Sequence, residues 1–190
     1  MNRFVRGAIA GAAGVALLLG GARSFALWNG AASAQAGTVQ SGTMTIANTP
    51  GSAAVWTVTH GGVTSAIPSI SAFRIVPGDT LTLTQKVDIS ASGDNLSAIL
   101  SLDPTSIVVG GNTASSELAS ALARTATMTI PGTLPAGLTA GPAPYSYKVT
   151  GALGTKTVTI VLSAPFDAAG TAAQGGTIDL TKLAFKLAQQ

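Results

Sequence analysis

The stretch Thr80-Leu-Thr-Leu-Thr84 alternates threonine with leucine at every position. Successive side chains of a β-strand point to opposite faces, so this pattern places the leucines on one face and the threonines on the other. Such a division is typical of a strand that is half buried in an antiparallel sheet. The stretch therefore predicts a strand with one face in a core and the other in water.

The same alternation recurs along the chain from residue 37 onward, again with threonine as the usual polar member. β-Branched residues fit the pleated surface of a sheet. The pattern therefore predicts an all-β fold, an antiparallel jelly-roll-like β-sandwich. Its further strands include Thr43-Met-Thr-Ile46, Thr125-Ala-Thr-Met-Thr-Ile130 and Thr157-Val-Thr-Ile160.

Polar and glycine-rich stretches are expected to set how these strands connect. Ser92-Gly-Asp-Asn95 separates two expected strands, 81–89 and 96–102, and predicts a hairpin between them. The apolar positions change phase at Ser41-Gly42, which indicates a bulge, and again near Thr181-Lys182, which indicates a break in the last strand.

One stretch has helical rather than strand periodicity. Leu118 and Leu122 lie four residues apart between Ser115 and Ala123, with serine available as a cap and Glu117 in the first turn. The pattern predicts one short helix that crosses over between strands.

The N-terminus has the features of an export signal. Two arginines among the first six residues precede an apolar run over residues 7–22, and small residues follow at Ser24 and Ala26. A positive region, an apolar region and a small-residue site define a secretory signal peptide. We expect residues 1–26 to be removed by a cut before Leu27, with no stable membrane span afterwards. The alternative is a leader that is retained as a membrane anchor.

Cleavage would leave residues 27–190 as a single domain that carries no net charge. Three of the ten Lys and Arg residues lie in 1–26, and the remaining seven balance the seven Asp and Glu residues. A neutral domain gives no support for nucleic-acid binding, which needs a basic face. Only 9% of the residues are charged, so copies repel one another weakly and are expected to associate easily.

Few residues are available for catalysis. The chain has one histidine, His60, no cysteine and no His-Glu-x-x-His motif, whereas zinc requires three or four ligands. We therefore expect no enzyme activity, no metal and no cofactor. A secreted hydrolase with a triad of His60, a serine and Asp79 or Asp103 is the weakest alternative, because no Gly-x-Ser-x-Gly elbow accompanies it.

Tyr145-Ser-Tyr147 places two rings on one face of an extended segment. They are a possible ligand platform for a sugar or a peptide, or they pack at an edge of the sandwich. The platform would make the chain a secreted monomeric binding or adhesion module.

The leader junction resembles a known export signal. Gly20-Gly-Ala22, Phe25-Ala-Leu-Trp-Asn29 and Gly37-Thr-Val-Gln-Ser-Gly-Thr-Met44 resemble the alternate signal peptides that a SipW-type signal peptidase reads in exported proteins of the TasA/camelysin type. Val76-Pro-Gly-Asp-Thr-Leu81, followed by Asn95-Leu-Ser-Ala-Ile-Leu100, looks like the "PGD" turn and the strand after it in that group.

This resemblance implies a secreted, extracellular or cell-surface protein that is a subunit of a biofilm-matrix fibre. Its partners would be the SipW-type signal peptidase during export and then itself or a homologous exported subunit. The strand formed by residues 27–46 would complete the sheet of the next subunit. In the alternative, that strand pairs within its own subunit and the protein stays monomeric. The expected assembly residues are Leu27, Trp28, Val39, Met44 and Ile46.

Overall fold

The computed structural model describes residues 38–143, 145–167 and 170–190. The predicted signal peptide and its cleavage residues Ser24, Ala26 and Leu27 lie outside them. The chain divides after Gln40, and residues 41–190 form one compact unit. In this unit antiparallel sheets predominate, with one α-helix among the described residues, so the predicted all-β sandwich with a short helix is confirmed.

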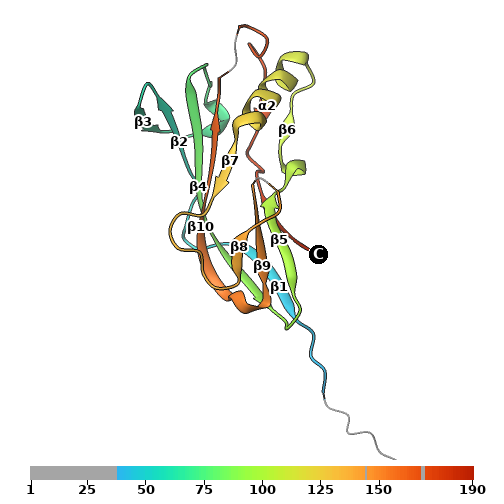
Figure 1. The fold of residues 1–190 in the computed structure, drawn as a ribbon. Coiled ribbons are helices and arrows are strands. Elements are labelled where there is room, and N and C mark those ends of the chain that lie inside the picture. The colour runs from blue at the N-terminus through green and yellow to red at the C-terminus, as the bar shows by residue number, and fades with distance from the viewer. Residues whose placement is uncertain (1–37, 144, 168–169) are drawn as a thin grey trace, which may run out of the picture. The chain divides into compact units, whose positions relative to one another are not determined.

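The first sheet, sheet A, is built around β4 (Asp79–Ser92), which begins with the threonine–leucine stretch. Figure 1 shows β10 beside β4, and the register pairs the two strands from Thr80 to Ala91 of β4. On its other side β4 pairs first with β2 and then with β1. The order is β3-β2-β4-β10-β7 with β1 also on β4. The bounds are β1 Thr43–Asn48, β2 Val55–His60, β3 Val63–Ala66, β7 Thr127–Thr129 and β10 Gly154–Pro165.

The second sheet, sheet B, has the order β12-β5-β9-β8. Its inner face packs against sheet A around Ile89, Leu100, Val149 and Ile160, each of which is fully buried. This cluster is the main core of the sandwich. The bounds are β5 Ser97–Leu102, β8 Leu138–Ala140, β9 Ser146–Thr150 and β12 Phe185–Gln189.

The helix α2 (Thr113–Thr125) contributes a second, smaller core. Leu118 and Ala121 pack there against Phe166, which follows β10. The helix begins after Asn112, whose Oδ1 accepts a hydrogen bond from the Ser115 backbone N–H at 2.8 Å. The remaining elements are β6 (Val108–Val109), β11 (Ile178–Asp179), η2 (Ile70–Ala72), η3 (Pro104–Ser106) and η4 (Gly151–Leu153).

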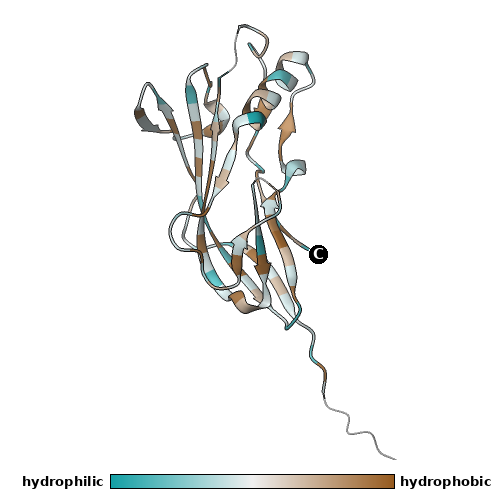
Figure 2. Ribbon diagram, viewed as in Figure 1, coloured by the Kyte–Doolittle hydropathy of each residue, from teal (hydrophilic) through white to brown (hydrophobic). Residues whose placement is uncertain are grey.

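Alternation along β4 divides its side chains between two environments. Leu81, Leu83, Gln85, Val87 and Ile89 are buried, whereas the residues that alternate with them are partly or fully exposed. Figure 2 shows the corresponding bands of apolar and polar residues along the strand. The period-two pattern therefore identified both the strand and its inner face.

The predicted hairpin between β4 and β5 is wrong, because the two strands belong to different sheets. The turn between them is an arch that carries the chain from sheet A to sheet B. Ile89 of β4 and Leu100 of β5 both belong to the main core. Burying these two apolar faces against each other is what separates the strands.

The two phase changes have different outcomes. Ser41-Gly42 lies ahead of β1, which begins at Thr43, so it forms no bulge within the strand. The break near Thr181-Lys182 is confirmed, because β11 ends before it and β12 begins after it. β11 pairs with β6 and β12 pairs with β5, so the break distributes the end of the chain between two sheets.

Candidate functional site

Sheet A is interrupted on one side of β4 at Gln85 and Lys86. The pairing of β1 ends on one side of these two residues and the pairing of β2 begins on the other, while residues 49–54 loop between them. Gln85 closes the gap, because its Nε2 donates to the carbonyls of Lys86 at 2.9 Å and Ser52 at 3.4 Å. These bonds allow a polar side chain that is 6% exposed to remain in the sheet.

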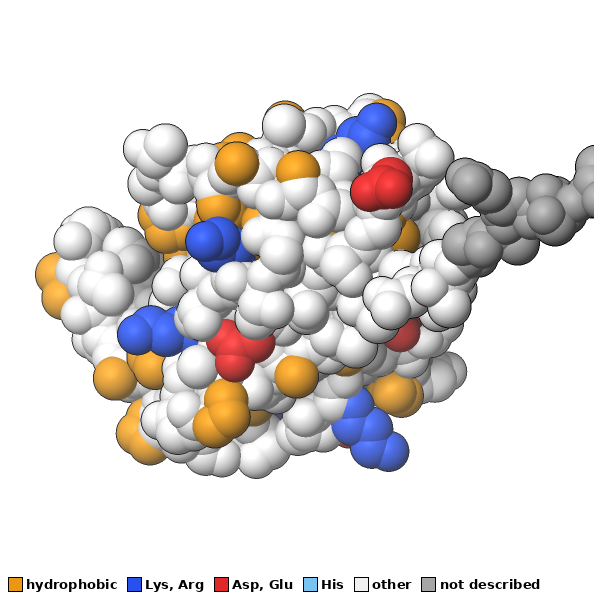
Figure 3. Space-filling view, turned by 90° about the horizontal axis from the view of Figure 1, so that it is seen from below, with side chains coloured by type: hydrophobic (Ala, Val, Ile, Leu, Met, Phe, Trp, Pro, Cys, Tyr) orange, Lys and Arg blue, Asp and Glu red, His pale blue; other side chains and the backbone are white. Residues whose placement is uncertain are grey.

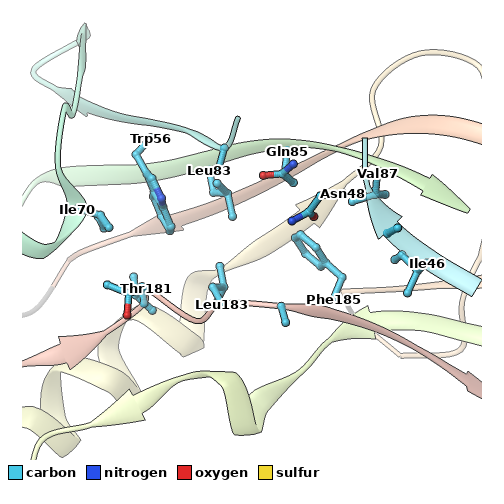
Figure 4. A pocket seen from close by; sticks show the side chains of 14 residues that line it. Ile46, Asn48, Trp56, Ile70, Leu83, Gln85, Val87, Thr181, Leu183 and Phe185 are labelled. Atoms are coloured by element: carbon cyan, nitrogen blue, oxygen red, sulfur yellow. The ribbon is translucent and has the colours of Figure 1, made fainter. Parts of the chain in front are cut away.

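A pocket of about 410 Å³, lined by apolar side chains but with much polar surface, lies between this interruption and residues 180–185. Figure 4 shows Trp56 and Leu83 pointing from sheet A toward the segment that carries Leu183. Phe185 extends from that segment toward Asn48 and Gln85, whose carboxamides are the polar groups on the sheet A side. We call this pocket, formed by residues of β1, β2, β4 and the segment 180–185, the edge groove.

Two strand edges border the edge groove. Within the described ranges, β1 pairs with no strand other than β4, and β12 pairs with no strand other than β5. The two strands also lie against each other across the sandwich. An edge strand presents main-chain N–H and C=O groups that can pair with an added strand. The groove can therefore offer both hydrogen-bonding groups and apolar surface to an extended peptide.

The structure does not bring all of the predicted assembly residues together. Met44 and Ile46 are half-buried in β1 and pack against the main core of their own chain. Val39 lies ahead of β1 and is 97% exposed. Leu27 and Trp28 lie outside the described residues. In this structure β1 thus completes its own sheet.

Sequence reasoning missed Asn48, Gln85 and the segment 180–185. One local signal was available, because Gln85 stands between Leu83 and Val87 on the apolar face of β4. A carboxamide at such a position indicates a gap or a site in an otherwise apolar surface. No local signal places residues 180–185 opposite it, because the two segments are far apart in the chain.

The two tyrosines have different environments. Tyr147 packs against the main core, and its hydroxyl accepts a hydrogen bond from the Ile130 backbone N–H at 2.9 Å. Tyr145 is 37% exposed and has a φ of 64°, in the left-handed region. Tyr145 is therefore the one of the two that presents its ring to solvent.

The structure brings His60 and Asp79 together as cross-strand partners. His60 Nδ1 lies 2.7 Å from Asp79 Oδ1, and Asp79 Oδ2 accepts a hydrogen bond from the Val76 N–H at 2.9 Å. Asp79 is buried and links the end of β2 to the turn at Pro77-Gly78. No serine or threonine hydroxyl of the described residues is hydrogen-bonded to His60. Asp103 instead accepts bonds from Thr105.

The described residues contain no group of three or more His, Cys, Asp or Glu side chains placed to hold a metal ion. No helix in the described ranges is long and apolar enough to cross a membrane. Comparison with family models, with curated proteins and with solved structures finds no match to this chain.

Proposed function

We propose that the chain is an exported structural subunit of a cell-surface or biofilm-matrix fibre, in which an N-terminal strand of one copy adds to the sheet of the next. The observation that supports this proposal is the edge groove, a pocket with both polar and apolar surface between two strand edges. Strand addition gains affinity from main-chain hydrogen bonds and specificity from alternate side chains in pockets. The edge groove offers both kinds of contact.

The donated segment would come from the part of the chain before β1. β1 is already paired with β4 in a single copy, so the remaining candidates lie between Leu27 and Gly42. Exposed Val39 falls in this stretch, and the resemblance to the TasA/camelysin type points to the same end of the chain. The acceptor would be the edge groove of the next copy.

Surface charge is consistent with close association. Figure 3 shows charged side chains scattered among uncharged ones on the face it presents. Residues 27–190 carry equal numbers of basic and acidic side chains. Electrostatic repulsion between two copies that approach each other is therefore weak.

The test compares chains that begin at Leu27 and at Gly37 by size exclusion and negative-stain electron microscopy. We expect fibres or large oligomers from the first chain and monomers from the second. If both chains remain monomeric, strand donation is refuted for this chain alone, and a monomeric binding module becomes the better proposal.

A matched pair of variants tests the acceptor. Ala184 is exposed and lines the edge groove, so Ala184→Lys should place a charge in the groove and block assembly without unfolding the domain. Val63 is 68% exposed on β3 and does not line the groove, so Val63→Lys should leave assembly unchanged. Equal behaviour of the two variants would exclude the edge groove as the acceptor.

A further inference from the structure

The outer face of sheet A, turned away from α2, carries an ordered set of hydroxyl groups. Leu81 and Leu83 of β4 are buried, and Leu81 lines the same cavity as Leu118 of α2. Thr80, Thr82 and Thr84 alternate with them and therefore point the other way. We define the threonine face as Thr80, Thr82 and Thr84 together with their outward-facing neighbours. These neighbours are the residues of β2, β3, β7 and β10 that lie at the same level of the sheet.

The register continues this face across the neighbouring strands. Thr82 is paired with Thr57 of β2 on one side and with Ser163 of β10 on the other, and Ser163 is paired with Thr127 of β7. Four strands thus present a hydroxyl at the same level, with neighbouring strands about 4.8 Å apart. One level away, Thr80 is paired with Thr59.

The hydroxyls of the threonine face are largely free. Thr59 and Thr64 bond to each other at 2.8 Å, whereas Thr57, Thr82, Ser163 and Thr127 have no side-chain hydrogen bond to any described residue. Each of these four hydroxyls can therefore donate one hydrogen bond to an external partner and accept two from it.

The other half of sheet A provides an internal comparison, because most of its outward hydroxyls are bonded to neighbouring side chains. Ser90 and Thr155 bond to each other at 3.0 Å, and Thr43 bonds to Ser92 at 2.9 Å. Thr157 and Thr49 both donate to Asp88, which lowers the pKa of that carboxyl. Free hydroxyls are therefore more frequent on the threonine face than in this half of the sheet, where Thr45 and Thr159 are the outward hydroxyls that have no side-chain bond to a described residue.

The charge of the threonine face restricts its partner. None of its outward positions in β2, β3, β4, β7 and β10 is Lys, Arg, Asp or Glu. The nearest outward charged residue along β4 is Lys86, whereas Asp79, which precedes Thr80, is buried. An anionic polymer would lose hydration on this surface without gaining an ion pair. A second protein surface that covered this face would bury the hydroxyls. It would then have to supply a hydrogen-bond partner to each of them from a few fixed side-chain positions.

We propose that the threonine face binds a neutral polysaccharide. Each sugar ring carries several hydroxyls that both donate and accept, and these match the free threonine hydroxyls. Threonine methyl groups and the side chains of Val55 and Val161, which are partnered with Thr84, offer apolar contacts to the C–H groups of the sugar. No aromatic ring stands on this face, so each subunit contributes weak binding, and many subunits together bind firmly. This site is separate from the edge groove.

The test is co-sedimentation of the exported chain with insoluble microcrystalline cellulose and with an insoluble neutral β-1,3-glucan, and with calcium alginate as the anionic comparison. We expect binding to at least one neutral polymer and at least tenfold less to alginate. The variant Thr57→Val/Thr82→Val/Ser163→Ala keeps the shape of the face and should reduce the bound fraction at least threefold. The control Thr43→Val/Ser90→Ala/Thr155→Val removes hydroxyls that are bonded to their neighbours in the other half of the sheet and should bind normally.

Three results would overturn the proposal: no binding to either neutral polymer, equal binding by the two variants, or disulfide-linked pairs of the variant Thr82→Cys. The last result would show that a second copy covers the face, and it is readily detected because the chain has no cysteine of its own. Circular dichroism checks folding, and the single variant Thr82→Val replaces the triple variant if the latter does not fold. Fibre formation is scored separately by electron microscopy, so failure here leaves the proposed assembly unaffected.

Discussion

Three glycines allow backbone segments to pass closely at the arch between β4 and β5. A Cβ atom on Gly151 would overlap the carbonyl oxygen of Gly93, and one on Gly42 would overlap the carbonyl oxygen of Ser92. Backbone atoms cannot rotate out of the way as the end of a long side chain can. The closed end of the sandwich therefore depends on the absence of side chains at these positions.

We expect Gly151→Ala to lower the free energy of unfolding by about 1–3 kcal/mol, the usual cost of forcing extra atoms into a packed site. The control is Gly111→Ala, because a Cβ atom there meets nothing within 4 Å. That variant should stay within about 0.5 kcal/mol of the parent chain. Urea and thermal unfolding followed by circular dichroism measure both changes. Equal stability of the two variants would show that the arch tolerates a side chain.

At the scale of the element, the proposed assembly leaves two possibilities for β1: it stays in its own sheet, or it exchanges between copies. Thr45 of β1 and Ser90 of β4 are direct cross-strand partners. A disulfide between cysteines at these two positions would hold β1 in its own chain. Because the chain has no other cysteine, the bond can form only within this pair or between copies, and mass spectrometry distinguishes the two.

We expect the oxidised Thr45→Cys/Ser90→Cys chain to assemble as the parent chain does, because the donated segment precedes β1. Electron microscopy with and without reductant provides the measurement, and the reduced double variant is its own control. Assembly only after reduction would mean that β1 itself is exchanged. The donor would then include Met44 and Ile46, in agreement with the predicted donor strand of residues 27–46.

Strands were predictable because the residues of a half-buried strand alternate between apolar and polar, so the local sequence shows which face is buried. The alternation in β4 and in β10 shows which side chains face the core, and the periodicity between Leu118 and Leu122 shows the helix. The choice of partner strand was not predictable in the same way. A polar turn of four residues suits both a hairpin and an arch, and core contacts between residues distant in sequence decide between them.

The candidate site was predictable only in part, for the same reason. Gln85 interrupts an apolar face and can be noticed in the sequence, but its position beside Phe185 depends on packing between the two sheets. The sequence pattern of a single strand suggested that Tyr147 is available to a ligand. In the structure its hydroxyl accepts a hydrogen bond from the Ile130 backbone N–H, which the pattern could not show. Local patterns describe a strand, whereas a site is made by several strands.

On the scale of the whole molecule, the domain has few charges and they balance. Charged residues are 9% of the chain, and residues 27–190 have seven of each sign. Ion pairs among the described residues are few, and Arg124 with Asp167 at 3.4 Å is exposed on both sides. Long-range electrostatic forces between copies should therefore be weak at any salt concentration.

Assembly of the chain that begins at Leu27 should consequently depend little on ionic strength. Between about 0.01 M and 0.15 M salt the screening length falls from about 30 Å to about 8 Å. Strong charge repulsion between copies would be relieved over this range, whereas main-chain hydrogen bonds and apolar burial would not change. We expect the assembly rate, followed by light scattering, to change by less than about twofold.

A charged variant of the same chain shows how the assembly rate would respond to salt if charge repulsion limited association. Ser116 and Ser120 are exposed on α2 and do not line the edge groove, so Ser116→Lys/Ser120→Lys adds two positive charges without changing the proposed interface. This variant should assemble more slowly at low salt and recover as salt is added, because its copies repel one another until the charges are screened. If the parent chain shows the same recovery, charge already limits its association, and the neutral surface is not what allows its copies to approach.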